Sequence, residues 1–209
     1  PFSDPMADGI VIQEAATRAL RNGMSLHILF EQLRDIRSDV RIPLILMGYL
    51  NPIMKFGFEA FCQKCVECGI DGVIIPDLPF KDYEETYKPI ADRYDIRVIM
   101  LITPETSEAR VREIDEHTDG FIYMVSSAAT TGAQKDFDSQ KQAYFKKIQD
   151  MHLRNPRMVG FGISNKQTFD AACANSSGAI IGSRFVTLLN EAEGDAEKAI
   201  TQLKEGLKK

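Results

Sequence analysis

The chain has 209 residues, of which 44% are hydrophobic and 26% are charged, a balance that is typical of a globular domain with a sizeable apolar core. This composition excludes disordered and fibrous proteins, and a formal net charge of −5 argues against a nucleic-acid partner, which would require clustered lysine and arginine. No apolar run reaches the roughly 18 residues that a membrane-spanning helix needs, so we expect no membrane span.

The chain opens with a polar loop, PFSDPMADG, in which prolines, aspartates and a glycine are typical of turns. Asp4 precedes Pro5 as a turn former, and Asp8 is placed to cap a helix that begins near Ile10. An aspartate in such a loop can also accept a hydrogen bond from a substrate N–H and stabilise a developing positive charge. Spacing alone favours the cap for Asp8.

Short apolar runs bounded by turn residues predict strands that are buried on both faces. They are Pro43–Gly48, Gly72–Asp77, Arg97–Ile102, Gly120–Val125, Met158–Ile163 and Gly178–Ser183. Helical periodicity predicts helices at Ile10–Arg21, Leu26–Arg37, Phe58–Cys68, Lys81–Tyr94, Ser107–His117, Phe137–Arg154, Lys166–Asn175 and Asp195–Leu207. This alternation indicates successive βα units, a parallel sheet and a single domain over residues 1–209.

Two α/β folds are built from such units. A dinucleotide-binding open sheet carries a G-x-G-x-x-G turn after an early strand, and none of these strands is followed by one. The glycines gather in GFGIS (160–164) and IIGS (180–183), where a (β/α)8 TIM barrel builds a phosphate site after strands 7 and 8. We therefore expect strands 3–8 of a barrel here, with strands 1–2, about 50 residues, missing from the N-terminus.

The same glycines suggest anion chemistry, because a residue without Cβ lets backbone N–H groups approach a phosphate. A helix beginning after Gly182 would add the positive end of its dipole. The loop Ser126–Gly132 would supply a third side of the phosphate site. Any one of these glycines is more simply a turn, whereas three such loops in barrel order favour phosphate binding.

Polar and aromatic side chains are also expected at strand ends. Asp77 lies between two prolines, where it either takes part in catalysis or orients a neighbouring loop, and we favour the second role. Tyr123 and Phe161 are placed either to stack on a planar substrate or to fill the barrel core, and both interpretations stay open.

Three cysteines, Cys62, Cys65 and Cys68, recur every third residue, so they share roughly one side of a predicted helix. Such a run occurs in zinc and iron–sulfur sites, but no second cysteine pair follows and the neighbours are apolar. We expect buried packing and no metal. The lack of a disulfide framework indicates a cytoplasmic protein.

Several motifs occur in one register along nearly the whole chain. They are PFSDPMADG followed by Ile12-Gln13, NPI (51–53), IIPDLP (74–79), TPETS (103–107), TTG (130–132), GFGIS and IIGS. Together they resemble the tryptophan synthase α subunit family, for which the first and fourth motifs are specific. The resemblance implies a lyase that reversibly cleaves indole-3-glycerol phosphate into indole and glyceraldehyde 3-phosphate, without a cofactor in this subunit.

The resemblance also implies roles for individual residues. Asp8 takes the position of the aspartate that contacts the indole nitrogen, which replaces the cap interpretation, and the family's general acid/base glutamate falls upstream of Pro1. The implied phosphate contacts are Gly132, Gly162, Gly182 and Ser183, the indole pocket contains Tyr123 and Phe161, and Thr131 closes the site over the substrate.

In this family the α subunit works in an α2β2 complex with a β subunit that carries pyridoxal phosphate. Asp4, Pro5, Asn51 and Pro52 match the face that meets the β subunit.

Two other functions are compatible with the pattern. One is another phosphate-binding barrel enzyme, an isomerase or a synthase, although a synthase would bring a lysine to a strand end and none of the predicted strands has one. The other is a non-catalytic subunit that activates a β partner.

Overall fold

The computed structural model describes residues 8–125, 134–160 and 162–208, with side chains of helix α8 from Gln140 onward. It divides into two compact units, each with its own parallel sheet. The first unit comprises Pro1–Asp8, Gln13–Met100 and His117–Gly120, and the second comprises Gly9–Ile12, Leu101–Glu116 and Phe121–Lys209.

The first unit contains a parallel sheet of β1 (Ile45–Met47), β2 (Gly72–Ile74) and β3 (Arg97–Ile99), in that order. Each strand falls inside a predicted apolar run, and the two strand pairs are in register from their first residues. Val73 and Val98 are 0% and 2% exposed, which confirms burial on both faces for the centres of β2 and β3. For β1 that prediction is wrong, because Ile45 and Met47 are 37% and 49% exposed.

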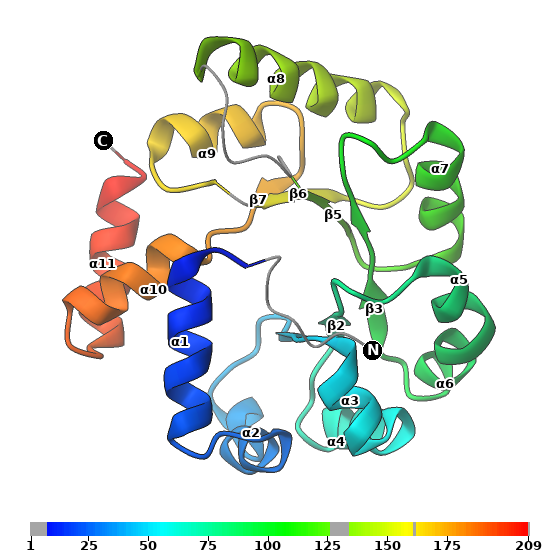
Figure 1. Ribbon diagram of the computed structural model, residues 1–209, viewed down its shortest axis with the longest axis vertical. Helices are drawn as coiled ribbons and strands as arrows, with labels where there is room; N and C mark the ends of the chain where they lie inside the picture. The colour runs from blue at the N-terminus through cyan, green and yellow to red at the C-terminus, as the bar shows by residue number, and fades with distance from the viewer. Residues whose placement is uncertain (1–7, 126–133, 161, 209) are drawn as a thin grey trace. The chain divides into compact units, whose positions relative to one another are not determined.

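Helices precede and connect these strands, and Figure 1 shows α4 and α6 side by side. They are α1 (Ile10–Arg21), α2 (Leu26–Leu33), η2 (Ile36–Ser38), α3 (Leu50–Phe56), α4 (Phe58–Glu67), α5 (Phe80–Asp82), η3 (Tyr83–Tyr87) and α6 (Lys88–Arg93). The start of α2 is fixed by Ser25, whose Oγ accepts the Ile28 N–H at 3.3 Å.

A proline interrupts the helix predicted over Lys81–Tyr94. The segment Tyr83–Tyr87 forms a π turn, in which the Lys88 N–H donates to the Tyr83 carbonyl. Pro89 follows at once; it has no N–H, and its ring excludes an α-helical carbonyl four residues earlier. The wider turn lets the chain continue as α6 without that clash.

The cysteine row packs into the core of the first unit, as predicted. Cys62 and Cys65 are 0% exposed and Cys68 is 4% exposed. Burial raises the pKa of the Cys62 and Cys65 thiols to about 12, so both stay neutral at physiological pH and behave as small apolar side chains. Among the residues described, no group of three or more histidine, cysteine or acidic side chains is arranged to hold a metal ion.

The second unit contains a parallel sheet of β4 (Leu101–Ile102), β5 (Ile122–Val125), β6 (Arg157–Gly160) and β7 (Gly178–Ala179). The apolar run predicted as one strand over 97–102 is therefore two strands, β3 and β4, in two different sheets. Every strand pair in both sheets is parallel, which confirms the predicted α/β class.

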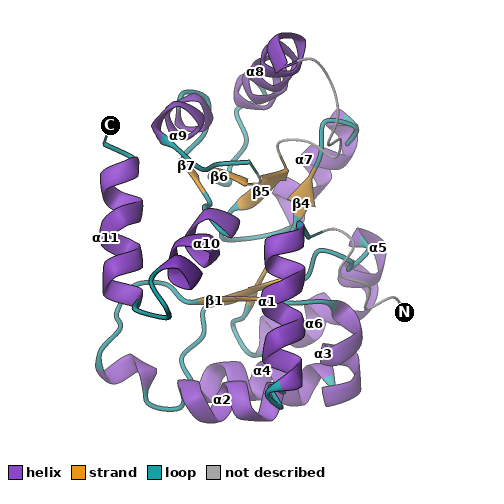
Figure 2. Cartoon of the chain, turned by 60° about the vertical axis from the view of Figure 1, so that its left-hand side comes forward, coloured by secondary structure: helices purple, strands orange, loops and turns teal. Residues whose placement is uncertain are grey.

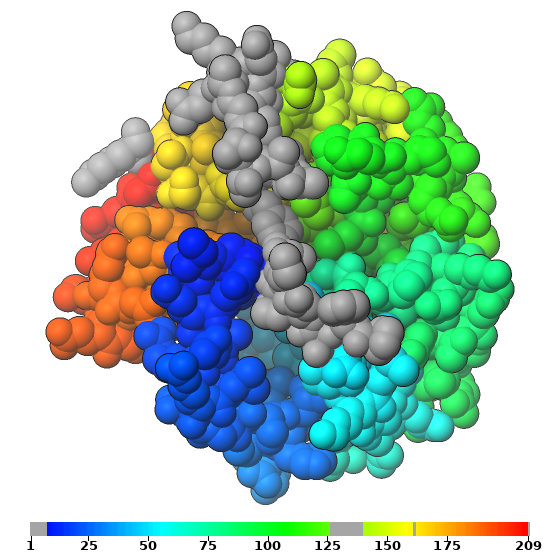
Figure 3. Space-filling view, viewed as in Figure 1, coloured from blue at the N-terminus to red at the C-terminus, as the bar shows by residue number. Residues whose placement is uncertain are grey.

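Figures 1 and 2 show α7, α8 and α9 along one face of this second sheet. The helices of the second unit are α7 (Glu108–His117), α8 (Gln134–Asp150), α9 (Lys166–Cys173), α10 (Ser183–Glu191) and α11 (Ala196–Gly206). α10 and α11 pack side by side around Leu188, Ala192 and Ala199, and their surface is continuous from orange to red in Figure 3. No helix within the described ranges is long and apolar enough to cross a membrane.

Candidate active site

The carboxyl ends of β1 and β2 carry two side chains of the candidate site. The strands are parallel, and the Gly48 N–H donates to the Ile74 carbonyl at 3.1 Å, so Tyr49 and Asp77 leave the same edge of the sheet. The Asp77 Oδ1 accepts the Leu50 N–H at 2.8 Å, at the first residue of α3. Asp77 therefore orients the loop after β1, which is the role favoured for it from the sequence.

Asp8 is half-buried and is held by two side chains of the same unit. The Tyr49 hydroxyl donates to the Asp8 Oδ2 at 2.6 Å, and the Gln13 amide donates to the Asp8 backbone carbonyl at 2.7 Å. Among the described residues, no backbone N–H is seen to donate to the carboxylate, so the helix-capping interpretation does not match the structure.

The predicted partner-contact residues lie in two places. Asn51 and Pro52 form the exposed first turn of α3, where a proline is tolerated because its N–H would have no helical acceptor. Asp4 and Pro5 fall outside the described residues, as do Thr131, Gly132 and Phe161.

In the second unit, β6 and β7 bring the predicted phosphate residues to one edge. The Ile180 N–H donates to the Val159 carbonyl at 2.8 Å, so the loops after the two strands begin side by side. Gly162 has φ 75°, a left-handed conformation that strains any side chain with a Cβ. Gly182 and Ser183 are exposed and begin α10.

The helices after these two strands differ at their N-termini. α9 begins with a capping box: Asn165 Oδ1 accepts the Thr168 N–H at 2.9 Å, and Thr168 Oγ1 accepts the Asn165 N–H at 3.2 Å. α10 begins at Ser183 with Gly182 as its N-cap residue, and none of the described side chains caps it. A helix N-terminus without a side-chain cap leaves its first-turn N–H groups to water or to an anion.

Tyr123 lies on β5 and is 4% exposed. The end of its ring, including the hydroxyl, occupies the place where a Cβ at Gly160 would lie. Tyr123 pairs with Met158, so Gly160 is its diagonal neighbour on β6 and has to be glycine for the ring to keep this position. The GFGIS motif thus contains one glycine for packing and another, Gly162, for backbone conformation.

Gly160→Ala should displace the Tyr123 ring, because the new methyl group occupies its position. We expect the free energy of unfolding to fall by roughly 1–3 kcal/mol, as in other overpacked sites, together with a loss of activity. Urea unfolding of the complete protein measures the first effect. Gly206→Ala is the matched control, since nothing lies within 4 Å of its added Cβ; an equal loss in both variants would contradict the packing argument.

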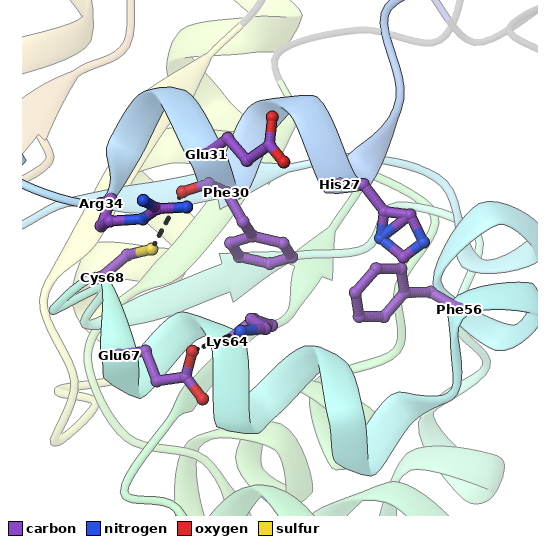
Figure 4. A pocket seen from close by; sticks show the side chains of 8 residues that line it. All are labelled: His27, Phe30, Glu31, Arg34, Phe56, Lys64, Glu67 and Cys68. Carbon is purple, nitrogen blue, oxygen red and sulfur yellow. Dashed lines mark hydrogen bonds and ion pairs between the residues drawn. The ribbon is translucent and has the colours of Figure 1, made fainter.

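A separate pocket of about 210 Å³ lies between α2 and α4 in the first unit (Figure 4). The rings of His27 and Phe56 lie next to each other at one end, tilted by 56°, with centroids 4.8 Å apart. Its charged residues lie on exposed helix faces, and Lys64 is paired with Glu67. None of the predicted site residues lines this pocket.

Sequence reasoning did not identify Tyr49. It stands 41 residues from Asp8, in no motif that carries chemistry by itself. The available signal was its position directly after the strand that neighbours the Asp77 strand.

The chain matches the family model of the tryptophan synthase alpha chain over residues 1–209. A tryptophan synthase alpha chain of Bacteroides fragilis is 80% identical over 204 residues, which cover 98% of this chain and 77% of that protein. The alpha chain of Bacteroides thetaiotaomicron is 79% identical over 208 residues, covering 100% of this chain and 81% of the relative.

Solved structures agree with these relatives. A tryptophan synthase complex from Pyrococcus furiosus is similar with a TM-score of 0.84 at 30% identity, covering 99% of this chain and 83% of that one. The tryptophan synthase alpha chain from Legionella pneumophila is similar with a TM-score of 0.83 at 30% identity, covering 100% of this chain and 78% of that one. The motifs thus predicted the family correctly, and the chain belongs to the tryptophan synthase alpha chain family.

Proposed function

We propose that this chain binds indole-3-glycerol phosphate and cleaves it reversibly to indole and glyceraldehyde 3-phosphate, the lyase reaction of its family in tryptophan biosynthesis. The observation that carries this proposal is the family match over residues 1–209, with relatives near 80% identity. The geometry of Asp8 and of the α10 N-terminus supports it independently, because the substrate has both an indole N–H and a phosphate.

The reaction is a retro-aldol cleavage. A proton is added at C3 of the indole ring, a base removes the glycerol hydroxyl proton, and the bond between C3 and the glycerol chain breaks. Positive charge develops on the ring nitrogen during this step. We assign its stabilisation to Asp8, whose carboxylate accepts the indole N–H. In the family a glutamate that precedes the position of Pro1 carries the proton transfers.

The phosphate is assigned to the glycine loops of the second unit. Gly182 and Ser183 lie at the start of α10, which no described side chain caps, and Gly162 lies in the loop after β6. Gly132 completes this set, Thr131 closes the loop over the substrate, and Tyr123 and Phe161 line the indole pocket.

The six predicted strand runs, of which the run over 97–102 contains both β3 and β4, are assigned to strands 3–8 of a single eight-stranded (β/α) barrel domain. The parallel pairing, the strand order within each sheet and the strand-end glycines support this assignment. We expect a cytoplasmic enzyme without a cofactor of its own.

A β subunit that carries pyridoxal phosphate is the proposed partner, in an α2β2 assembly. The similar Pyrococcus furiosus structure is a tryptophan synthase complex. Asn51 and Pro52 offer an exposed helix turn for this contact, and Asp4 and Pro5 are assigned to the same interface.

The test is release of indole from indole-3-glycerol phosphate by the complete natural protein, alone and with its β subunit. We expect indole in both cases and faster release in the complex. A protein that releases no indole but accelerates the β reaction would be a non-catalytic subunit. Turnover of a different phosphate ester, with no indole released, would identify another barrel enzyme.

A further inference from the structure

We propose that Tyr49 is a positioning residue for this reaction: its hydroxyl fixes one oxygen of the Asp8 carboxylate and leaves the other oxygen for the indole N–H. The inference rests on the proposed function and adds to it a residue that no motif indicates. Its basis is the hydrogen bond from the Tyr49 hydroxyl to the Asp8 Oδ2, which is 2.6 Å long.

This hydrogen bond is short for an O–H donor, as expected where the acceptor is a carboxylate. It joins residues 41 positions apart, so it holds the Asp8 loop against the segment that follows β1 rather than against its own helix. The Gln13 amide holds the Asp8 backbone carbonyl at 2.7 Å. The side chain and the backbone of Asp8 are thus fixed from two different directions.

Tyr49 is itself held in place by α3. It is the N-cap residue of that helix, in an extended conformation with φ −81° and ψ 154°. Asp77 accepts the next backbone N–H, that of Leu50, at 2.8 Å, and Ile53 anchors the first turn with 3% of its surface exposed. A side chain supported in this way loses little further entropy when it orients a reacting group.

Asp77, Tyr49 and Asp8 are therefore positioned one by the next. Asp77 fixes the start of α3, the start of α3 fixes Tyr49, and Tyr49 fixes Asp8. A carboxylate oxygen has more than one lone pair, so the Tyr49 contact does not prevent Asp8 from accepting the substrate N–H.

Tyr49→Phe removes the hydroxyl and keeps the ring. We expect kcat for indole release to fall about tenfold, with KM for indole-3-glycerol phosphate within about twofold of wild type, since the contact acts on the reacting state rather than on phosphate binding. Tyr94→Phe is the matched control, because its hydroxyl donates to the exposed Glu59 in a 3.3 Å hydrogen bond, away from Asp8. Unchanged kcat in Tyr49→Phe overturns the proposal.

A double-mutant cycle separates positioning from general support of the fold. In an Asp8→Ala background, adding Tyr49→Phe should change kcat less than twofold, because its effect passes through Asp8. A further tenfold fall in that background would show an effect independent of Asp8 and would contradict the proposal.

Variants of Asp77 test whether its hydrogen bond to the Leu50 N–H positions Tyr49, and they leave the side chains of Tyr49 and Asp8 unchanged. Asp77→Asn keeps the Oδ1 acceptor and should retain nearly full kcat, whereas Asp77→Ala should lower it about as much as Tyr49→Phe. Equal losses in both variants would mean that the charge of Asp77 matters, which contradicts a purely positioning role. A wild-type protein that releases no indole overturns the proposed function itself, whereas active wild type with unaffected variants overturns only this inference.

Discussion

Asp8→Asn in the complete protein should lower kcat for indole release by at least about a hundredfold. The substitution keeps the shape of the side chain but removes the negative charge that stabilises the cation developing on the indole nitrogen. The amide also replaces one of the two carboxylate oxygens with an NH2 donor, so the Tyr49 hydroxyl and the substrate N–H can no longer each donate to an oxygen of their own. KM should change little, because the phosphate contacts are untouched. Indole release in steady state measures both constants.

The matched control is Asp82→Asn, the same change at an exposed position of α5. It should leave both kinetic constants at wild-type values. Asp8 has no part in the mechanism if Asp8→Asn turns over substrate at the wild-type rate.

Ser183→Asp should weaken binding of the phosphate substrate and, at the same time, stabilise the free protein. A carboxylate in the first turn of α10 interacts favourably with the helix dipole, by about 0.3–1 kcal/mol. The same carboxylate repels a phosphate dianion at that terminus by roughly 2 kcal/mol, so KM should rise by more than about tenfold. Steady-state kinetics and thermal unfolding give the two effects separately.

Ser25→Asp provides the comparison, since it adds the same charge at the N-cap of α2, in the other compact unit. It should leave KM unchanged. A rise in KM of similar size in both variants would indicate a general effect of net charge, and an unchanged KM in Ser183→Asp would remove the α10 terminus from the phosphate site.

The strands were predictable because each lies in a short apolar run, which in β2 and β5 reflects burial on both faces. The ends of the strands were less predictable: β1 is Ile45–Met47, which is shorter than the predicted Pro43–Gly48. The division of one run into β3 and β4 at Met100 had no signal, because Met100 is an apolar residue buried like Ile99 and the break depends on which strands pair.

Helices were predictable where amphipathic periodicity was long. α1 has the predicted bounds, whereas α3 was missed, because Pro52 and Gly57 suggest a loop although they mark the two ends of a short helix. The predicted helix after β2 contains a π turn that Pro89 makes necessary. Periodicity reports which face is buried, and it does not report local changes in hydrogen bonding.

Some residues of the candidate site could likewise be predicted from the sequence, and others could not. The strand-end glycines and Asp77 could be predicted from their positions, since parallel strands bring their carboxyl ends together. Asp8 required the family resemblance, because a polar residue before a helix looks like a cap. The Tyr49 contact was beyond the sequence, since a hydrogen bond between residues 41 apart depends on where two loops meet.

The contrast between α9 and α10 has a consequence for how the protein responds to its surroundings. In α9, the capping box of Asn165 and Thr168 satisfies part of the first turn from within the chain. α10 leaves that turn to water or to an anion. By mass action, the proposed substrate then shifts the folding equilibrium in proportion to its abundance, and the helix pair α10–α11 becomes more resistant to local opening when the pathway supplies phosphate esters.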